Sequence, residues 1–221
     1  MKISAIITAA GLGNRFGEKK QFKSLCGQSL YHYSLWVFLD VKIFDEIILV
    51  VPEDNKDFIK QDIKSVFDES IKVVVGGDTR QDSVRGGVQA SNSNSELVVI
   101  HDAARPFVTK KLINASIMGC ENADGSIVAI PPVDTIKYSK SFIIESTIDR
   151  KHAWLAQTPQ TFKKKQLLNA YKNNTSKFLS FTDESSIMEE MGYKISIVQG
   201  SDRNFKITTN DDWDRAEAIL K

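Results

Sequence analysis

A glycine-rich segment near the start of the chain combines backbone amides with cationic side chains. Gly11, Gly13 and Gly17 lie within seven residues, with Arg15 between them and Lys20 shortly after. Glycine lets the backbone approach a phosphate group closely, and guanidinium and ammonium groups neutralise its charge. The segment is not a P-loop, because no GK[ST] follows, and in the dinucleotide motif the third glycine would come one residue earlier. It is a candidate phosphate-binding loop, and the alternative is an ordinary turn with solvated cations.

Two further polar segments, Gly76–Ser83 and His101–Pro106, each follow a short apolar run. Taken alone, the first also fits a glycine turn followed by a capped helix. His101 beside Asp102 resembles part of a hydrolase triad, but the chain contains no GxSxG nucleophile motif, so we assign the histidine a structural role. The Asp102 carboxylate is suited to a magnesium ion or a ribose hydroxyl.

Several polar clusters lie where a fold needs few polar residues, and they comprise Asp134–Lys137, Asp149–Arg150, Gln157–Gln160 and Asn204–Thr208. In the last of these, Lys206 stands between Phe205 and Ile207, and a strand there would turn the lysine to the opposite face from its neighbours. The run Lys163–Lys165 is expected to be solvated.

The apolar runs that must position these segments alternate between short and long. Strands are expected at Ile3–Ala9, Glu46–Val51, Ile71–Val75, Glu96–Ile100, Gly125–Ile130 and Lys194–Val198, and helices at Ser29–Leu39, Asn55–Phe67, Ser83–Ser91, Lys110–Glu121, Lys163–Asn173, Asp183–Met191 and Asn210–Leu220, the last with an asparagine cap. This alternation predicts a doubly wound α/β fold with a mostly parallel sheet covered on both faces. Ligands bind at the carboxyl edge of such sheets, where the glycine-rich segments fall.

The segment Val133–Trp154 breaks the alternation. It holds two extended pieces separated by a polar tip, and it is expected to form a β-arm that protrudes from the sheet. The sequence contains no repeat, low-complexity tract or linker, so we expect one domain over residues 1–221 with an arm at about 133–154.

Composition limits the classes of function. Of 221 residues, 42% are hydrophobic and 26% charged, which predicts a folded chain. The formal charge of +1 argues against a broad nucleic-acid or membrane surface and leaves room for a small basic pocket. Cys26 and Cys120 form no CxxC motif, so neither a disulfide framework nor a structural zinc site is expected. We expect no signal peptide or membrane span, and a soluble, cytoplasmic protein.

Taken together, the motifs resemble those of the 2-C-methyl-D-erythritol 4-phosphate cytidylyltransferase family. The matching segments, in order, are Ala9–Arg15, Lys20–Phe22, Gly76–Asp78, Asp82–Val84, His101–Pro106, Asp134–Lys137, Thr147–Arg150, Gln157–Gln160, Thr182–Glu184 and Asn204–Thr208. The resemblance covers nearly the whole chain. Thr8 and Lys19 depart from it, because proline is common at both positions.

The resemblance implies a Rossmann-like nucleotidyltransferase that joins CTP to a sugar-alcohol phosphate, methylerythritol phosphate, and releases diphosphate in the non-mevalonate isoprenoid pathway. It implies Arg15 and Lys20 as catalytic residues. For the acceptor phosphate it implies Thr135, Arg150, Thr158, Lys206 and Arg105. For the nucleotide it implies Ala9, Ala10, Gly11, Gly13, Gly77, Asp78, Ser83, Asp102 and Ala103.

The same resemblance implies Mg²⁺ or another divalent cation, carried mainly by the CTP phosphates and near Asp102. It also implies a homodimer formed through the arm, so that Thr135 and Arg150 serve the neighbouring site. Two alternatives remain open from the sequence: a ribitol-5-phosphate cytidylyltransferase, which shares the nucleotide half, and a non-catalytic nucleotide-binding relative.

Overall fold

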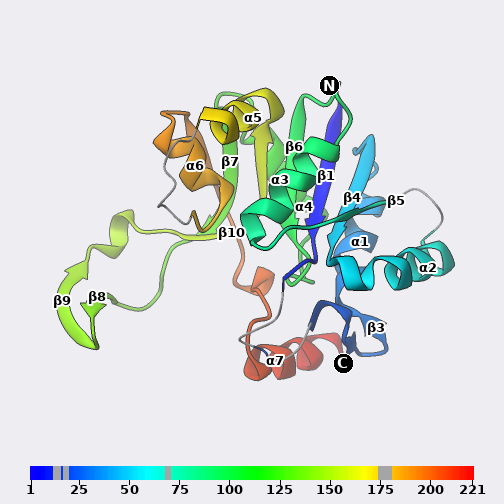
Figure 1. The fold of residues 1–221 in the computed structure, drawn as a ribbon. Helices are drawn as coiled ribbons and strands as arrows, with labels where there is room; N and C mark the ends of the chain where they lie inside the picture. Colours follow the sequence, from blue (N-terminus) through cyan, green and yellow to red (C-terminus); the bar gives the residue numbers. More distant parts are fainter. Residues whose placement is uncertain (12–15, 17–19, 68–70, 174–180) are drawn as a thin grey trace.

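Seven strands form the central sheet of the protein (Figure 1). The computed structural model describes residues 1–11, 16, 20–67, 71–173 and 181–221. In spatial order the strands are β11 (Ile195–Gln199), β7 (Gly125–Ile130), β10 (Leu155–Lys163), β6 (Leu97–Asp102), β1 (Ile3–Thr8), β4 (Glu46–Val51) and β5 (Ile71–Val75). Only β10 runs antiparallel to its neighbours, and the other pairings are parallel. The predicted α/β fold with a mostly parallel sheet is confirmed.

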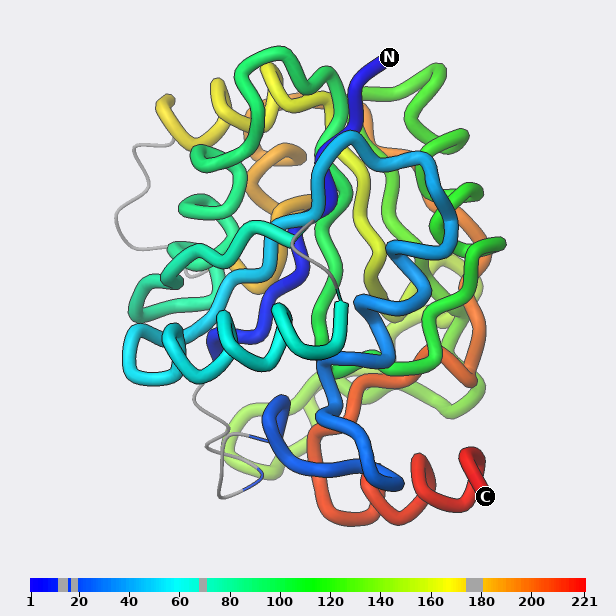
Figure 2. The backbone as a smooth tube through the Cα atoms, turned by 90° about the vertical axis from the view of Figure 1, so that its right-hand side faces the viewer, coloured from blue at the N-terminus to red at the C-terminus, as the bar shows by residue number. Residues whose placement is uncertain are grey.

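Helices cover both faces of the sheet, as Figure 2 shows. One face packs against α1 (Leu30–Asp40), α2 (Lys56–Val66) and α4 (Lys110–Met118), and the other against α3 (Arg80–Ala90), α5 (Lys164–Asn173) and α6 (Glu184–Glu190). Successive side chains of a strand point to opposite faces, so in β1 Ala5 and Ile7 enter the first core while Ile6 enters the second. Burial on both faces explains the continuous apolar runs of these strands.

A third, smaller core lies at the carboxyl edge of the sheet, at the bottom of Figure 1. There α7 (Asn210–Leu220) packs near the short strands β2 (Ser24–Leu25) and β3 (Gln28–Ser29), with Trp213 in contact with the ring of Phe16. The cap of α7 is Thr209, whose hydroxyl accepts a hydrogen bond from Asp212 N at 3.2 Å. The expected asparagine cap is therefore wrong by one position, because Asn210 is the first helical residue.

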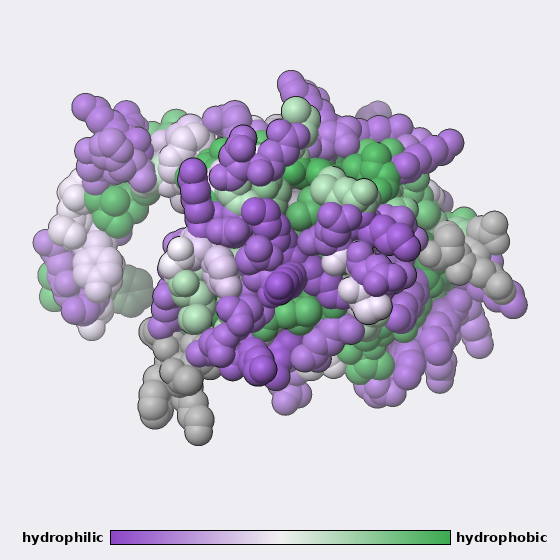
Figure 3. Space-filling model, turned by 90° about the horizontal axis from the view of Figure 1, so that it is seen from above, coloured by the Kyte–Doolittle hydropathy of each residue, from purple (hydrophilic) through white to green (hydrophobic). Residues whose placement is uncertain are grey.

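The predicted arm is a two-stranded hairpin of β8 (Ile136–Lys140) and β9 (Ile143–Ile148). It stands apart from the sheet, and Figure 3 shows it as a separate mass that carries hydrophobic side chains. Phe142, Ile143 and Ile144 at its tip are exposed. In this chain alone, nothing among the described residues buries these apolar side chains.

One strand was missed, and two expectations about smaller features are wrong. The polar cluster Gln157–Gln160 belongs to the central strand β10, which the sequence analysis did not predict. The segment around Lys206 is no strand, because a short 3-10 turn at Asp202–Asn204 is followed by irregular extended chain. Lys164 is buried, and its ammonium group donates to the carbonyls of Ser91 and Asn92.

None of the described helices is long and apolar enough to cross a membrane.

Candidate active site

A pocket of about 330 Å³ opens at the carboxyl edge of the sheet, between the segments that follow β1, β5 and β6. Its walls come from four segments distant in sequence. The first supplies Thr8–Gly11, Lys20 and Gln21; the second supplies Asp78–Arg80 and Ser83; the third supplies Asp102 and Ala104; and the fourth supplies Lys206. Parallel strands bring their carboxyl ends to one edge, so the fold places these polar segments side by side.

The loop after β1 is held in place by a buried side chain. Gln21 donates from Nε2 to the carbonyl oxygens of Ala9 at 2.9 Å and Gly11 at 2.7 Å. A buried amide group is costly without partners, and these two bonds satisfy both of its N–H groups. Gln21 therefore fixes the backbone of the candidate phosphate loop at the point where Lys20 enters the pocket wall.

The turn after β5 requires glycine because its backbone lies against α3. A Cβ atom on Gly76 would lie 2.6 Å from both Ala10 Cβ and Ser83 Oγ, and one on Gly77 would lie 2.5 Å from Asp82 Cβ. The Gly77 N–H donates to Ser83 Oγ at 3.2 Å. Because these two glycines have no side chains, the turn lies directly against Ala10 and the start of α3. The first residues of α3 therefore stand beside the loop that follows β1.

Asp102, the last residue of β6, is the centre of a charged cluster in the pocket wall. Its Oδ2 accepts from Lys206 Nζ at 2.7 Å, and its Oδ1 accepts from Arg80 Nε at 3.1 Å. Arg105 Nε lies 4.0 Å from Oδ2, and the Thr8 hydroxyl lies 3.4 Å from Oδ1. Burial raises the pKa of Asp102, but the nearby cations outweigh it and hold that pKa well below its usual range. Asp102 is therefore an anion that organises the surrounding cations.

Behind Asp102, a hydrogen-bond chain fixes the tautomer of His101. The Arg105 carbonyl can only accept, so His101 Nε2, 3.1 Å away, carries the proton and Nδ1 is the acceptor. Thr158 Oγ1 then donates to Nδ1 at 3.0 Å and accepts from the Asp102 N–H at 3.0 Å. Burial lowers the pKa of His101 to about 4, so the imidazole is neutral at physiological pH. With both nitrogens engaged, His101 has no free nitrogen to act as a base.

Lys206 is positioned by contacts between its segment and β10. Asn204 is fully buried and donates from Nδ2 to the Thr158 carbonyl at 2.8 Å and to Gln157 Oε1 at 3.2 Å. Ile207 N donates to the Ala104 carbonyl at 2.9 Å. These bonds hold the irregular segment against the sheet, and they explain how a lysine outside any strand still faces Asp102.

The pocket brings together many of the residues that the sequence predicted. Those in its wall are Ala9, Ala10, Gly11, Lys20, Asp78, Ser83, Asp102 and Lys206. Two more predicted residues, Gly77 and Ala103, are next to the wall in the chain. Behind the wall lie Arg105 and Thr158. The Arg105 guanidinium donates to Asn204 O at 2.9 Å. Arg15 and Gly13 lie outside the described residues.

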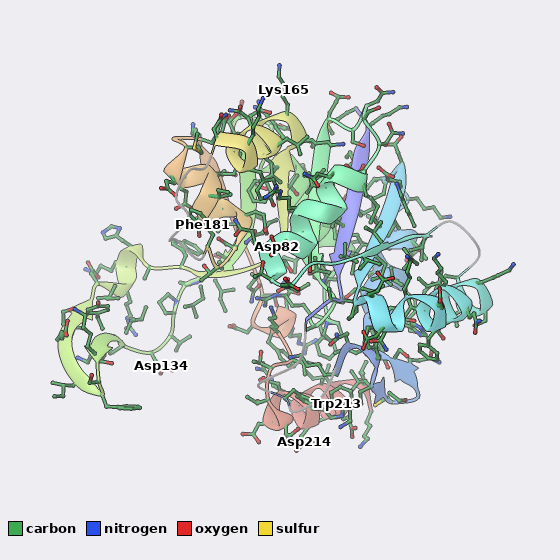
Figure 4. The ribbon with its side chains drawn as sticks, in the orientation of Figure 1. Asp82, Asp134, Lys165, Phe181, Trp213 and Asp214 are labelled. Carbon is green, nitrogen blue, oxygen red and sulfur yellow. The ribbon has the colours of Figure 1, made fainter. Side chains whose placement is uncertain are left out.

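Thr135 and Arg150 are not brought to the pocket. Both are exposed on the arm, and the Arg150 guanidinium donates to the Val133 carbonyl. In Figure 4, Asp134 at the base of the arm lies well apart from Asp82, which hydrogen-bonds the pocket residue Thr79. Within one chain, the residues predicted to bind the acceptor therefore form two separate groups.

Protein ligands for a metal are few in the part of the chain that the structure describes. No group of three or more His, Cys, Asp or Glu side chains is placed to hold an ion there. The pocket wall contains two carboxylates, Asp78 and Asp102. Mg²⁺ is commonly bound by one or two carboxylates together with substrate phosphates, so this donor set fits a magnesium ion that arrives with a nucleotide.

Two charged residues of the site were missed from the sequence. Arg80 lines the pocket, and its Nη1 donates to Oε2 of Glu184 at 2.8 Å. Glu184, the first residue of α6, is buried. Arg80 lies in a segment that the sequence analysis did single out, but no local pattern signals a partner 104 residues away.

Comparison with known proteins gives a consistent result over the whole chain. The family model described as 2-C-methyl-D-erythritol 4-phosphate cytidylyltransferase matches residues 3–221. A protein of that description from Syntrophus aciditrophicus is 39% identical over 225 residues, covering 100% of this chain and 96% of that protein. One from Aquifex aeolicus is 39% identical over 217 residues, covering 98% of this chain and 97% of that protein.

Solved structures agree with the sequence comparison. The crystal structure of 4-diphosphocytidyl-2C-methyl-D-erythritol synthase from Anaerococcus prevotii matches with a TM-score of 0.87 and 35% identity, covering 99% of this chain and 98% of that one. The crystal structure of 2-C-methyl-D-erythritol 4-phosphate cytidylyltransferase from Thermus thermophilus matches with a TM-score of 0.82 and 28% identity, again covering 99% and 98%.

Proposed function

The chain belongs to the 2-C-methyl-D-erythritol 4-phosphate cytidylyltransferase family, and we propose that the pocket at the carboxyl edge of its sheet is where it joins CTP to 2-C-methyl-D-erythritol 4-phosphate. The products are 4-diphosphocytidyl-2-C-methyl-D-erythritol and diphosphate. The observation that carries the proposal is a pocket whose wall joins the start of the glycine-rich segment to Lys20, Arg80 and Lys206, in front of a His101 whose two ring nitrogens are both engaged. Family membership favours this acceptor over ribitol 5-phosphate.

The chemistry needs charge stabilisation more than proton transfer. An oxygen of the acceptor phosphate forms a bond to the α-phosphorus of CTP, and the bond from that phosphorus to the leaving diphosphate breaks. A phosphate monoester has a second pKa of about 6, so the nucleophile is already mostly a dianion at neutral pH. A neutral, fully engaged His101 is consistent with a reaction that requires no base.

Negative charge builds on the reacting phosphorus and on diphosphate, and cations in the pocket would stabilise it. Lys20 is the described side chain that we assign to this role, together with Arg15. Lys206 would hold the acceptor phosphate, because its ion pair with Asp102 uses one N–H and leaves the remaining donors for a ligand. A magnesium ion bound to the CTP phosphates would add positive charge at the same place.

The nucleotide would bind along the glycine turn and the end of β6. Backbone groups at Gly77, with Asp78 and Ser83, would recognise cytosine through its exocyclic amine, which uracil lacks. Asp102 and Ala103 would lie near the ribose and the metal. Ala9, Ala10 and Gly11, whose backbone Gln21 fixes, would contact the phosphates.

The acceptor site would be completed by a second chain. Thr135 and Arg150 lie on an arm that carries exposed apolar side chains, and a two-stranded hairpin is marginal in water by itself. A twofold-related copy is the commonest partner for such a surface. We therefore propose a homodimer in which the arm of one subunit brings Thr135 and Arg150 to the pocket of the other, where Thr158, Arg105 and Lys206 stand.

The activity is tested by measuring diphosphate release from CTP with each acceptor. Methylerythritol phosphate should support turnover in the presence of Mg²⁺, and ribitol 5-phosphate should give a much lower kcat/KM. UTP in place of CTP should also be a poor substrate. Equal rates with CTP and UTP would show that the glycine turn does not select the base, and turnover restricted to ribitol phosphate would overturn the acceptor assignment.

The shared site is tested by mixing two inactive variants, Lys20→Ala and Arg150→Ala. If the arm of each subunit completes the neighbouring pocket, a mixed dimer contains one site in which both residues are intact, so activity returns on mixing. Exchange of subunits is followed independently with fluorescent labels. Exchange without recovery of activity would mean that each chain builds its own site.

A further inference from the structure

A chain of charge contacts leads from the pocket wall into the interior of the protein. Asp102 stands in the wall, Arg80 contacts it through Nε at 3.1 Å, and Glu184 contacts Arg80 through Nη1 at 2.8 Å. The Glu184 side chain is only 1% exposed, whereas that of Arg80 is 27% exposed. Glu184 therefore lies behind the pocket, and its ion pair with the Arg80 guanidinium connects it to the pocket wall.

Burial makes the Glu184 carboxylate dependent on Arg80. Desolvation raises the pKa of Glu184, and the charge of Arg80 opposes that effect. A buried charge whose partner is removed is strongly unfavourable, so the ion pair holds both side chains in one arrangement. In the described structure Arg80 is the cation that contacts this carboxylate.

The geometry of arginine explains how the interaction reaches Asp102. The guanidinium is planar and rigid, and two acceptors placed on different nitrogens fix its orientation. With Nη1 held by Glu184, Nε is directed at Asp102 Oδ1. Without that anchor, Arg80 could turn toward solvent through the pocket opening, and Asp102 would keep Lys206 at 2.7 Å but lose its second close cation.

The charges of the groups around Asp102 and Glu184 also connect Glu184 to the pocket wall. Asp102 is surrounded by Lys206, Arg80 and Arg105, and Glu184 faces Arg80 as well as the carboxylates of Asp183 and Asp102. If Glu184 became neutral, the cluster would gain one positive charge. Lys206 and Arg80 would then be held less closely in the positions that a phosphate ligand meets.

We propose that Glu184 is a positioning residue for the cytidylyl-transfer reaction: its buried carboxylate fixes Arg80, and Arg80 fixes Asp102 in the pocket wall. The inference rests on the proposed function for the role of the pocket, and it goes beyond that function by extending the site to α6. Glu184 contacts no substrate in this scheme.

The test is a double-mutant cycle between Glu184→Gln and Asp102→Asn. Glutamine keeps the size of the side chain and one acceptor oxygen but removes the charge. In the wild-type background we expect Glu184→Gln to lower kcat/KM for CTP about 10- to 100-fold, in the range seen when a residue that orients a ligating group is replaced. In the Asp102→Asn background the same change should alter kcat/KM less than about threefold, because contacting residues are coupled.

A matched control comes from the same helix. Glu189 is exposed on α6, and Glu189→Gln should leave kcat/KM unchanged. Urea unfolding of every variant separates loss of stability from loss of positioning, since a purely structural role would give the same fold loss in both backgrounds. Arg80→Lys, which keeps the charge but cannot bridge two carboxylates with a fixed fork, should reproduce the Glu184→Gln effect and serves if that variant does not fold.

The same cycle on the dissociation constant of CTP gives a readout that does not depend on turnover. Failure of the wild-type enzyme to turn over methylerythritol phosphate would count against the proposed function, and the cycle on CTP binding would still test the coupling. Equal fold losses in the two Asp102 backgrounds, or no loss from Glu184→Gln, would overturn the inference.

Discussion

Replacing Thr158 by valine should destabilise the protein, because the threonine hydroxyl connects two buried groups. Its oxygen accepts from the Asp102 N–H and donates to His101 Nδ1, each at 3.0 Å, and Thr158 itself is 3% exposed. Valine has nearly the same shape, so the change removes the hydroxyl and leaves the packing almost intact. The backbone N–H and the imidazole nitrogen would then be buried without partners.

The size of the effect follows from those two groups. Leaving one buried polar group unsatisfied costs about 1–3 kcal/mol. The imidazole can relax by a small rotation, so we expect a total of about 2 kcal/mol instead of twice the value for one group. For a chain of this length that free energy corresponds to a fall in Tm of roughly 4–8 °C.

Urea unfolding measures the loss directly, as a lower midpoint with an unchanged m value. Thr158→Ser is the matched control, because it keeps the hydroxyl and removes only a methyl group. A valine variant as stable as the wild type, with the serine variant also unchanged, would refute the hydrogen-bond chain. The same variants test the predicted acceptor contact: if the hydroxyl also reaches the acceptor, valine raises the KM for methylerythritol phosphate more than the KM for CTP.

Three further predictions follow from the site and its surroundings. Lys20→Ala should lower kcat at saturating substrates by ~10²–10³, as for the loss of one transition-state donor, and near-normal turnover would contradict that role. Burial lowers the pKa of His101 from 6.5 to about 4, so as the pH falls the unfolded state binds a proton before the folded state does. The free energy of unfolding should therefore fall by up to ~3 kcal/mol between pH 6.5 and pH 4. The urea midpoint of His101→Gln should lack this part of the pH dependence. Burial raises the pKa of the Cys120 thiol to about 11, whereas Cys26 is exposed. Iodoacetamide at mildly alkaline pH should therefore alkylate Cys26 in the native protein and Cys120 only in denaturant. Mass spectrometry of the peptides measures the two modifications.

The parallel part of the fold was predictable because its strands are buried on both faces. Glu46–Val51, Ile71–Val75 and Gly125–Ile130 are strands with the bounds expected from their apolar runs. Helix boundaries were less accurate, since capping residues decide them. The cap of α3 is Thr79, whose hydroxyl accepts from Asp82 N, so the helix begins at Arg80 and not at Ser83 as expected.

The strand β10 was not predictable from its local pattern. Gln157 and Gln160 are polar yet buried, and Pro159 between them cannot donate to a neighbouring strand. The sheet accommodates the proline with a shift in the β10–β7 register between Gln157 and Gln160. Long-range contacts therefore override a sequence that looks like a polar loop.

Part of the candidate site could be predicted from local sequence patterns, and part of it depends on long-range contacts. Segments such as Gly76–Ser83 could be assigned to a ligand pocket because they follow strands, and the topology of a parallel sheet brings strand ends together. The pairing of Arg80 with Glu184 and of Asp102 with Lys206 could not be predicted, since each joins residues 104 positions apart. Charge partners across such distances are set by tertiary packing and leave no periodic signal.

The antiparallel direction of β10 also determines where the arm leaves the sheet. The strand β7 ends at Ile130 on the carboxyl edge, and β10, its neighbour, begins at Leu155 on that same edge. A tight hairpin could have joined them, yet residues 131–154 extend away from the body instead (Figure 1). Thr135 and Arg150 lie on this segment, and neither lines the pocket of its own chain. In the proposed dimer such an arm completes the phosphate site of the other molecule, so a variant that prevents dimerisation is predicted to raise the KM for the acceptor while CTP binding in each pocket persists.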